Sequence, residues 1–169
     1  MDRITQPLRD EHKDLFPHVE SLRLAADAVS GLPLTPEALG LIEEAHTFLI
    51  HHLIPHAEAE DKALYPVVQK VMGTPKATAT MSRDHVEVGT LTSELSELRQ
   101  QLTLAKFSSE QANDLRRVLY GLYTLVKVHF AKEEEIYLPL LDASLTPDEG
   151  AAMFRTMEAA AAEVKSHLK

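Results

Sequence analysis

The chain repeats one pattern of polar residues at a constant offset of 73 positions. Four residues of the first half recur with the same identity in the second half, as the pairs His12/His85, His56/His129, Glu60/Glu133 and Pro66/Pro139. Each half therefore supplies one isolated histidine and one His-x-x-x-Glu pair. The repeat predicts two similar halves, and its residue types are those that bind metal ions through nitrogen and oxygen.

Each half also contains two long segments whose apolar residues recur every three or four positions, a spacing typical of amphipathic helices. The expected helices span about 7–30, 36–72, 75–106 and 109–140. Polar residues interrupt the apolar face of each helix, in the order His12, then His56 and Glu60, then His85, then His129 and Glu133. These six side chains are therefore predicted to point into the core.

Cap and turn residues delimit these helices. Gly31 is the expected end of the first helix. Pro55 and Pro66 lie inside the second helix, so a kink or break is expected near one or both. Helix starts are expected after the N-cap residues Thr5, Thr35, Ser108 and Thr146.

Four amphipathic helices joined by short connections fold as an antiparallel up-down bundle. Counting from the expected turns places the six interrupting side chains at similar heights, because each residue adds about 1.5 Å along a helix. The expected fold class is all-α, with the bundle at about residues 6–142 of a single domain that spans 1–169. A short extra helix is expected at about 146–168, with Met153 and Met157 packed against the bundle end or in a dimer contact.

Composition excludes several classes of function. The chain contains no cysteine, which excludes disulfides and thiolate metal sites. Its formal net charge of −9 argues against nucleic acid as the main partner. The N-terminal residues lack an apolar signal segment, and no stretch reaches the roughly 18–20 apolar residues of a membrane span. We therefore expect a cytoplasmic protein that binds neither nucleic acid nor membrane.

The six core-facing polar residues predict a metal site only in combination. A single histidine on an apolar face is usually a hydrogen-bonded core residue, and one His-x-x-x-Glu pair is expected by chance in a chain with nine histidines. Burying two carboxylates and four imidazoles without a compensating charge, however, costs several kcal/mol per unpaired group. A pair of metal cations supplies that charge.

Two longer motifs extend the repeat, His56-x-x-x-Glu60-Asp61-x-x-Leu64-Tyr65-Pro66 and His129-x-x-x-Glu133-Glu134-x-x-Tyr137-Leu138-Pro139. Together with Glu11-His12 and Asp84-His85, they resemble the hemerythrin-like family, also called the HHE cation-binding domain. The resemblance covers about residues 8–141. It implies a non-haem di-iron centre inside a four-helix bundle.

Carried over by position, the resemblance implies four terminal nitrogen ligands, His12, His56, His85 and His129, and two bridging carboxylates, Glu60 and Glu133. The expected cofactor is a pair of iron ions, joined by an oxo or hydroxo bridge when oxidised. Zinc or manganese could occupy the same ligands. Glu134 is an alternative to Glu133, because oxygen carriers place the carboxylate five residues after the histidine, but the repeat favours Glu133.

One position departs from the oxygen-carrying hemerythrins, which have a second histidine four residues after the first on the third helix. Here the residue four after His85 is Gly89. Four histidines instead of five leave a coordination position open, which favours reaction with O2, hydrogen peroxide or NO over reversible oxygen carriage. His52, one turn before His56, is an alternative fifth nitrogen, although its repeat counterpart is Leu125.

The expected function is therefore the binding or reduction of a small oxidant at an iron pair, and whether the protein turns over as an enzyme is left open. The alternatives are an iron- or oxygen-responsive regulatory module without turnover, and storage of iron or O2. A homodimer or an unknown protein partner is also left open.

The other polar residues have simpler interpretations. His46 is expected in the core at one end of the bundle, and Tyr65 and Tyr137 in packing contacts or in hydrogen bonds to a ligand. The expected surface residues are the histidines His18, His51 and His167 and an acidic face of Glu58, Asp61, Glu134 and Glu135.

Overall fold

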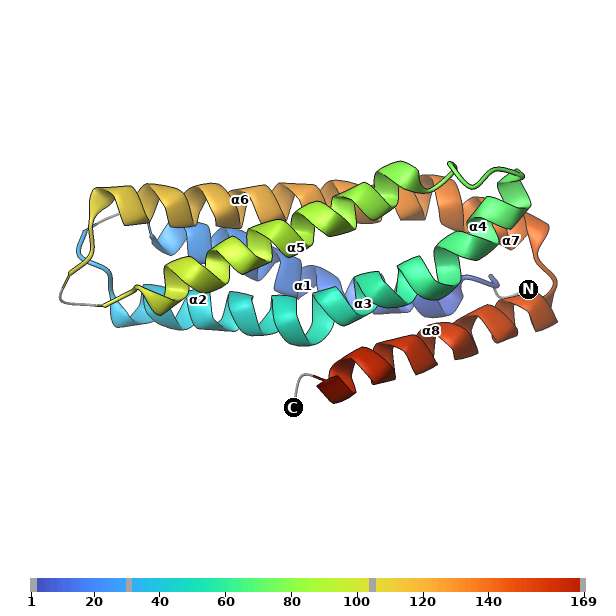
Figure 1. Cartoon of the computed structure of the whole chain (residues 1–169), viewed down its shortest axis with the longest axis horizontal. Coiled ribbons are helices and arrows are strands. Elements are labelled where there is room, and N and C mark those ends of the chain that lie inside the picture. The colour runs from blue at the N-terminus through green and yellow to red at the C-terminus, as the bar shows by residue number, and fades with distance from the viewer. Residues whose placement is uncertain (1–2, 30–31, 104–105, 168–169) are drawn as a thin grey trace.

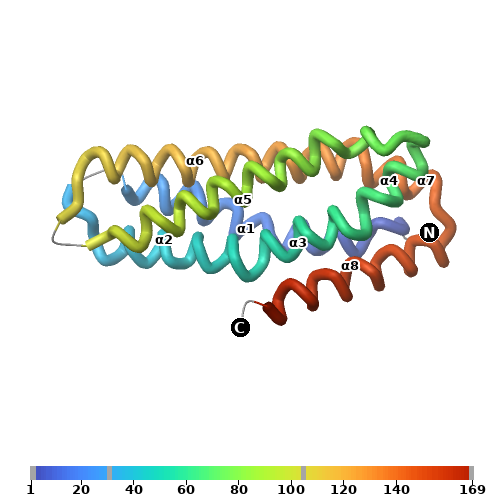
Figure 2. Tube along the Cα trace, in the orientation of Figure 1, coloured from blue at the N-terminus to red at the C-terminus, as the bar shows by residue number. Residues whose placement is uncertain are grey.

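The computed structural model describes residues 3–29, 32–103 and 106–167, and it confirms the expected all-α bundle. Four long helical segments run alternately up and down, so that segments adjacent in the sequence are antiparallel (Figure 1). The first segment is α1 (Gln6–Ala28) and the third is α5 (Ala79–Gln100). The tube in Figure 2 follows the same path, and α6 contacts both α1 and α5.

The second and fourth segments are composite, because short π-helical stretches interrupt the α-helical hydrogen bonding. The second segment consists of α2 (Pro36–Phe48), η1 (Leu49–Leu53), α3 (Ile54–Ala59), η2 (Glu60–Leu64) and α4 (Tyr65–Met72). The fourth consists of α6 (Ser109–Lys132), η3 (Glu133–Tyr137) and α7 (Leu138–Ser144). Pro55, Pro66 and Pro139 each come second in the α-helix that follows a π stretch, so the N–H that proline lacks falls where the helical pattern changes.

Two of the π stretches begin at the repeated glutamates, η2 at Glu60 and η3 at Glu133. A π turn joins residue i to i+5, so it moves the buried face on by one position. Leu138 is consequently fully buried, whereas Ile136 is 56% exposed. An uninterrupted α-helical period would place Ile136 in the core, so that period does not continue past Glu133.

Side-chain caps form at three of the four expected helix starts. The hydroxyls of Thr35, Ser108 and Thr146 each accept a hydrogen bond from the backbone N–H three residues later. α1 begins directly after Thr5, as expected, but the Thr5 side chain forms no such bond; its φ of −86° and ψ of 9° differ from the extended conformation of a capping residue. The expected helix end at Gly31 lies outside the described residues, whereas Gly73 ends α4 with a left-handed φ of 69°.

The apolar core is divided into two clusters that lie on either side of the polar residues. One cluster includes Leu15, Leu53, Val88 and Val126, and the other includes Leu8, Ala59, Met81 and Leu138. Each of the four long segments contributes to both clusters, with its polar interruption between them. The six polar side chains therefore occupy one layer that crosses the bundle.

The C-terminal helix α8 (Pro147–His167) runs back along the outside of the bundle, against α3 and η2 (Figure 1). Met153 and Met157 are buried in this contact. At Gly150 the helix passes so close to Ile4 that an added Cβ would lie 2.3 Å from the Ile4 Cγ2, which favours glycine here.

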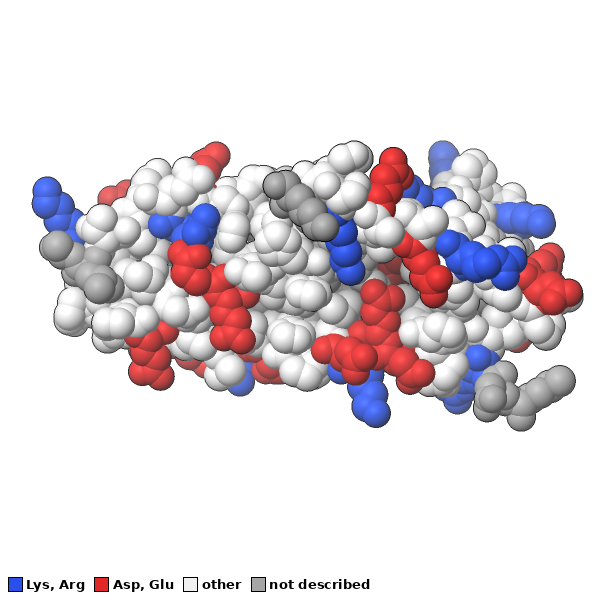
Figure 3. All heavy atoms as spheres, turned by 90° about the horizontal axis from the view of Figure 1, so that it is seen from below, with Lys and Arg blue, Asp and Glu red and all other residues white. Residues whose placement is uncertain are grey.

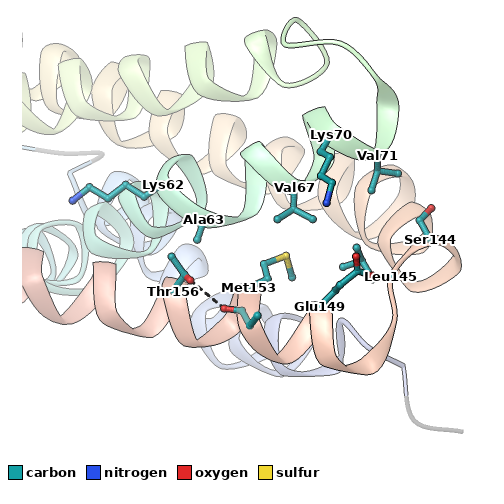
Figure 4. A pocket seen from close by; sticks show the side chains of 11 residues that line it. Lys62, Ala63, Val67, Lys70, Val71, Ser144, Leu145, Glu149, Met153 and Thr156 are labelled. Carbon is teal, nitrogen blue, oxygen red and sulfur yellow. Dashed lines mark hydrogen bonds between the residues drawn. The ribbon is translucent and has the colours of Figure 1, made fainter.

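Between α8 and α4 a cavity of about 470 Å³ remains, and Figure 4 shows Val67 and Met153 lining it.

The surface that carries α8 has no single sign of charge. Seen from below, acidic and basic side chains are interspersed along the molecule (Figure 3). Within the described ranges, no helix has the length and apolar character that crossing a membrane requires.

Candidate metal centre

The structure brings all six predicted ligand side chains together in the polar layer. Their potential ligand atoms form two groups, and within each group these atoms lie within 4.8 Å of one another. The first group contains His12, His56, Glu60 and Glu133, and the second contains Glu60, His85 and His129. Both glutamates are completely buried. Each group could hold one metal ion.

Both glutamates lie between the two groups. Glu60 Oε1 lies 3.1 Å from His56 Nε2 and 3.7 Å from His12 Nε2, whereas its Oε2 lies 3.3 Å from His85 Nε2 and 3.9 Å from His129 Nε2. Glu133 Oε2 lies 3.4 Å from His12 Nε2, and its Oε1 lies 3.5 Å from His129 Nε2. Each carboxylate thus directs one oxygen to each side, which is the arrangement that bridging two cations requires.

Unsatisfied polar atoms indicate that a cation fits here. Among the described residues, the buried side-chain atoms without a hydrogen-bond partner include His12 Nε2, His56 Nε2, both oxygens of Glu60 and Glu133 Oε2. Each such atom costs about 1–3 kcal/mol when it is left unpaired in the interior. Imidazole and carboxylate together suit iron, zinc or manganese. The residues present therefore fit a pair of divalent or trivalent ions.

Each of the four histidines is held in place by an outer carboxylate. The Nδ1 atoms of these rings lie 2.8–3.0 Å from a carboxylate oxygen, in the pairs His12–Glu134, His56–Glu11, His85–Asp61 and His129–Asp84. Such a bond fixes the ring orientation and leaves Nε2 free to bind a metal. From the sequence we expected Asp61 and Glu134 on a solvated acidic face, but both bind the ring of a ligand histidine. Glu58 and Glu135 are exposed, as that prediction requires.

The outer contacts follow the repeat, which makes the site approximately two-fold symmetric. The pairs His56–Glu11 and His129–Asp84 are related by the 73-residue offset, and so are His12–Glu134 and His85–Asp61, with the halves exchanged. The symmetry extends one step further outward. Arg9 forms an ion pair with Glu134, and its counterpart Ser82 donates to Asp61 at 2.6 Å.

Tyr65 breaks this symmetry. Its hydroxyl donates to Glu133 Oε1 at 2.8 Å and lies 3.2 Å from His129 Nε2 and 3.3 Å from His85 Nε2. The π stretch η2 accounts for this position, because it places the residue five after Glu60 on the same helix face. The counterpart of Tyr65 is Leu138, which offers no polar atom. The two groups of ligands are therefore chemically different.

Opposite charges inside the layer shift the pKa values of its members. Burial alone raises the pKa of the Glu60 carboxyl, but His56, His12 and His129 outweigh burial and hold it well below its usual value. Burial lowers the pKa of His129, but Glu133 and Glu60 outweigh it and raise this pKa to about 10. Glu60 and Glu11 likewise raise the pKa of His56 well above its usual value, against the effect of burial. Without metal, these shifts favour protonated His56 and His129 rings beside an ionised Glu60 carboxylate.

These shifts predict that metal binding releases protons. At pH 7 the raised pKa values keep His56 and His129 protonated in the metal-free protein, and a metal ion binds only the deprotonated rings. Binding of the metal pair at pH 7 should therefore release on the order of two protons, and affinity should increase as the pH rises toward 10. Calorimetric titrations with Zn²⁺ in buffers of different ionisation enthalpy measure this number. Binding heats that are independent of the buffer would contradict the prediction.

The remaining histidines lie outside the two ligand groups. His52, the alternative fifth nitrogen, is exposed, and its ring stacks parallel to that of His18 with 6.2 Å between the centroids. His46 is half-buried, and its Nε2 lies 2.7 Å from Ser96 Oγ. Glu134, the alternative to Glu133, points to the outer side of His12 instead of into the layer.

The fold and the site define an α-helical bundle with buried nitrogen and oxygen ligands for cations. Residues 3–141, most of the chain, match the family model described as the hemerythrin HHE cation-binding domain. The chain therefore belongs to this family, and its α8 lies beyond the matched residues. Neither the curated proteins nor the solved structures contain a significant match.

Two features of the site were not fully predicted from the sequence. The outer carboxylates were not predicted, and the hydrogen bond from Tyr65 to Glu133 was one of two alternatives for that residue. The carboxylates could have been found, because Glu11, Asp61, Asp84 and Glu134 each adjoin one of the six central residues in the sequence. The position of Tyr65 depends on the π stretch, which the helical period alone does not predict. The sequence signal for the π stretch is the proline six residues after each repeated glutamate.

Proposed function

We propose that this chain is a non-haem di-iron protein whose metal pair reacts with a small oxidant, namely O2, hydrogen peroxide or NO. The observation that carries this proposal is a cavity of about 10 Å³ that borders both ligand groups at His56, Glu60, His85 and His129. A cavity of this size holds at most one molecule of about the size of water, so only a very small ligand can lie between the two groups. Its other walls are apolar, formed by Leu53, Ala57, Val88, Val126 and Phe130.

The residues around the cavity have distinct roles in this proposal. His12 and His56 would hold one ion, His85 and His129 the other, and Glu60 and Glu133 would bridge them. A bound iron pair supplies the electrons that reduce the oxidant. The outer carboxylates fix the imidazole rings, and the apolar walls exclude bulk water.

Tyr65 contributes a proton donor at the second ligand group. Burial and the nearby carboxylates of Glu60 and Glu133 raise the pKa of its phenol, so the hydroxyl keeps its proton. The hydroxyl hydrogen-bonds to Glu133 Oε1 and lies next to the Nε2 atoms of His129 and His85. It can therefore hold a proton beside the place where an oxidant would bind.

Gly89 brings no ligand to the site, although the structure has room for a side chain at this position. A Cβ added to Gly89 would have no neighbouring heavy atom within 4 Å. Gly89 follows His85 by one turn of α5, so it lies on the same side of that helix. A site with four histidines, and with no fifth imidazole at this position, favours reaction with an oxidant over a fully occupied carrier site.

The test compares three iron-loaded proteins. With ascorbate added to return the oxidised iron pair to its reduced state, the unmodified protein should consume hydrogen peroxide or NO catalytically. Gly89→His should slow consumption by about tenfold or more, because a fifth imidazole would fill the open position, whereas Gly89→Ala should retain the activity. Consumption is measured with an oxidant electrode, and iron content with a metal assay. Failure of all three proteins to consume peroxide, NO or O2 with two irons bound would reject the proposed reaction.

One observation favours a regulatory module as the second candidate function. α8 packs against α3 and η2, which carry His56 and Glu60, so a movement of these two elements on metal binding would reach α8 directly. This alternative predicts a metal-dependent change in the protection of α8 from hydrogen exchange, with no catalytic consumption of an oxidant.

A further inference from the structure

A second cavity opens on the other side of His12, between α1 and the α6–η3 segment. Its volume is about 530 Å³, which lies in the range of small-molecule sites. Its walls are largely apolar and include the rings of Phe16 and Phe130. Phe16 is 40% exposed at the mouth, whereas Phe130 is buried. Two phenyl rings on opposite helices suit a planar aromatic molecule better than a flexible aliphatic chain.

Cationic side chains surround this α1–α6 cavity. Its lining includes Arg9, Lys13 and Lys127, with Glu134 as the only acidic member among the described residues. Glu134 is already bound to Arg9 and to His12 Nδ1. Lys127 lies over the Tyr123 ring, 5.3 Å from its centroid, and donates a hydrogen bond to the Tyr123 hydroxyl at 3.1 Å. In the described parts of the chain, neither Lys127 nor Lys13 forms an ion pair.

This local charge contrasts with the rest of the chain. A formal net charge of −9 repels anions in general, so an anion is attracted only where cations outnumber carboxylates locally. The cavity between α8 and α4 also has two lysines at its edge, but Lys62 pairs with Glu163 at 3.5 Å and Glu149 lines the same cavity. Charge complementarity therefore distinguishes the α1–α6 cavity.

The cavity also adjoins the metal layer directly. Phe130 stacks on His12, with 4.3 Å between the centroids and 11° between the ring planes, and both rings line the cavity. A molecule in the cavity therefore lies next to His12, a side chain of the first ligand group. No other layer of protein intervenes between the occupant and His12.

We propose that the α1–α6 cavity is a binding site for a planar aromatic anion, whose ring lies between Phe16 and Phe130 and whose carboxylate, sulfonate or phosphate group meets Lys13 and Lys127. Its place beside His12 is the one that a reductant of the metal pair would occupy. The role as a reductant rests on the proposed function, whereas binding of the anion does not.

A matched pair of fluorescent probes tests the binding. Riboflavin and flavin mononucleotide share one aromatic ring system and differ in the phosphate group. The protein should bind flavin mononucleotide at least about tenfold more tightly than riboflavin, as measured by fluorescence anisotropy at low salt. The double variant Lys13→Glu/Lys127→Glu should remove this preference and leave the affinity for riboflavin unchanged within about twofold.

Two further variants separate this site from other surfaces. Phe16→Ser should weaken both probes to a similar extent, because it removes an aromatic wall without changing the charge. Lys70→Glu, in the cavity between α8 and α4, should change neither affinity. The proposal is overturned if the double variant retains the preference for flavin mononucleotide, if Lys70→Glu removes it, or if the two probes bind equally.

The proposed reductant role is tested separately. Reduced flavin mononucleotide should support faster peroxide consumption by the unmodified iron-loaded protein than by the double lysine variant. Binding without this difference rejects the reductant role alone. Loss of consumption with every reductant rejects the proposed oxidant chemistry and leaves the binding site intact.

Discussion

Replacing Glu60 or Glu133 with alanine should abolish stoichiometric binding of two metal ions per chain. Each carboxylate directs one oxygen toward each ligand group, at 3.1–3.9 Å from the histidine nitrogens, so its removal takes a ligand from both ions at once. Metal content after gel filtration, together with the optical spectrum of the iron-loaded protein, measures the loss. A variant at either position that retains two ions would contradict the bridging assignment.

Glu134→Ala is the matched control for this experiment. Glu134 follows Glu133 directly but contacts the outer nitrogen of His12, so its removal leaves both central carboxylates in place. We expect this variant to keep two ions, with affinity weakened by about 10- to 100-fold. If Glu134→Ala lost both ions while Glu133→Ala kept them, Glu134 would be the bridging residue.

Removal of the metal ions should lower the thermal stability of the protein substantially. Without cations the layer retains buried atoms without hydrogen-bond partners, including both oxygens of Glu60. A ligand at about 1,000 times its dissociation constant stabilises the folded state by about 4 kcal/mol. For a chain of this size that corresponds to a melting temperature about 8 °C higher or more. Calorimetry before and after chelation measures the difference.

The glutamate variants again provide the control. Glu133→Ala cannot bind the metal pair, so chelator should leave its melting temperature unchanged. An equal response of this variant and the unmodified protein to chelator would mean that the stabilising ions bind elsewhere. Equal melting temperatures of the metal-loaded and metal-free protein would show that the polar layer is already satisfied without cations.

Much of this architecture could be predicted from the sequence because it depends on local periodicity. Apolar residues at helical spacing predict the four long segments, and the breaks in that spacing at His12 and His85 predict which side chains face the core. The 73-residue repeat then relates the two halves. Helix caps at Thr35, Ser108 and Thr146 were also predictable, because capping depends on residues close in sequence.

The π stretches limited the prediction. Glu60 and Glu133 begin η2 and η3, and each extra residue rotates the following helix, which exposes Ile136 and brings Tyr65 into the ligand layer. The α-helical period alone does not predict such an inserted residue. Only the proline after each stretch suggests it.

By itself, the sequence determined the helices, the identity of the six polar residues in their faces and the symmetry between the halves, because these depend on residue type and spacing along one chain. Only the tertiary structure decided which oxygen of Glu60 faces which histidine, which outer carboxylate holds each ring, and that the stacked rings of His12 and Phe130 line a cationic cavity. These contacts join residues from different helices, and their distances depend on how the helices rotate and pack against one another.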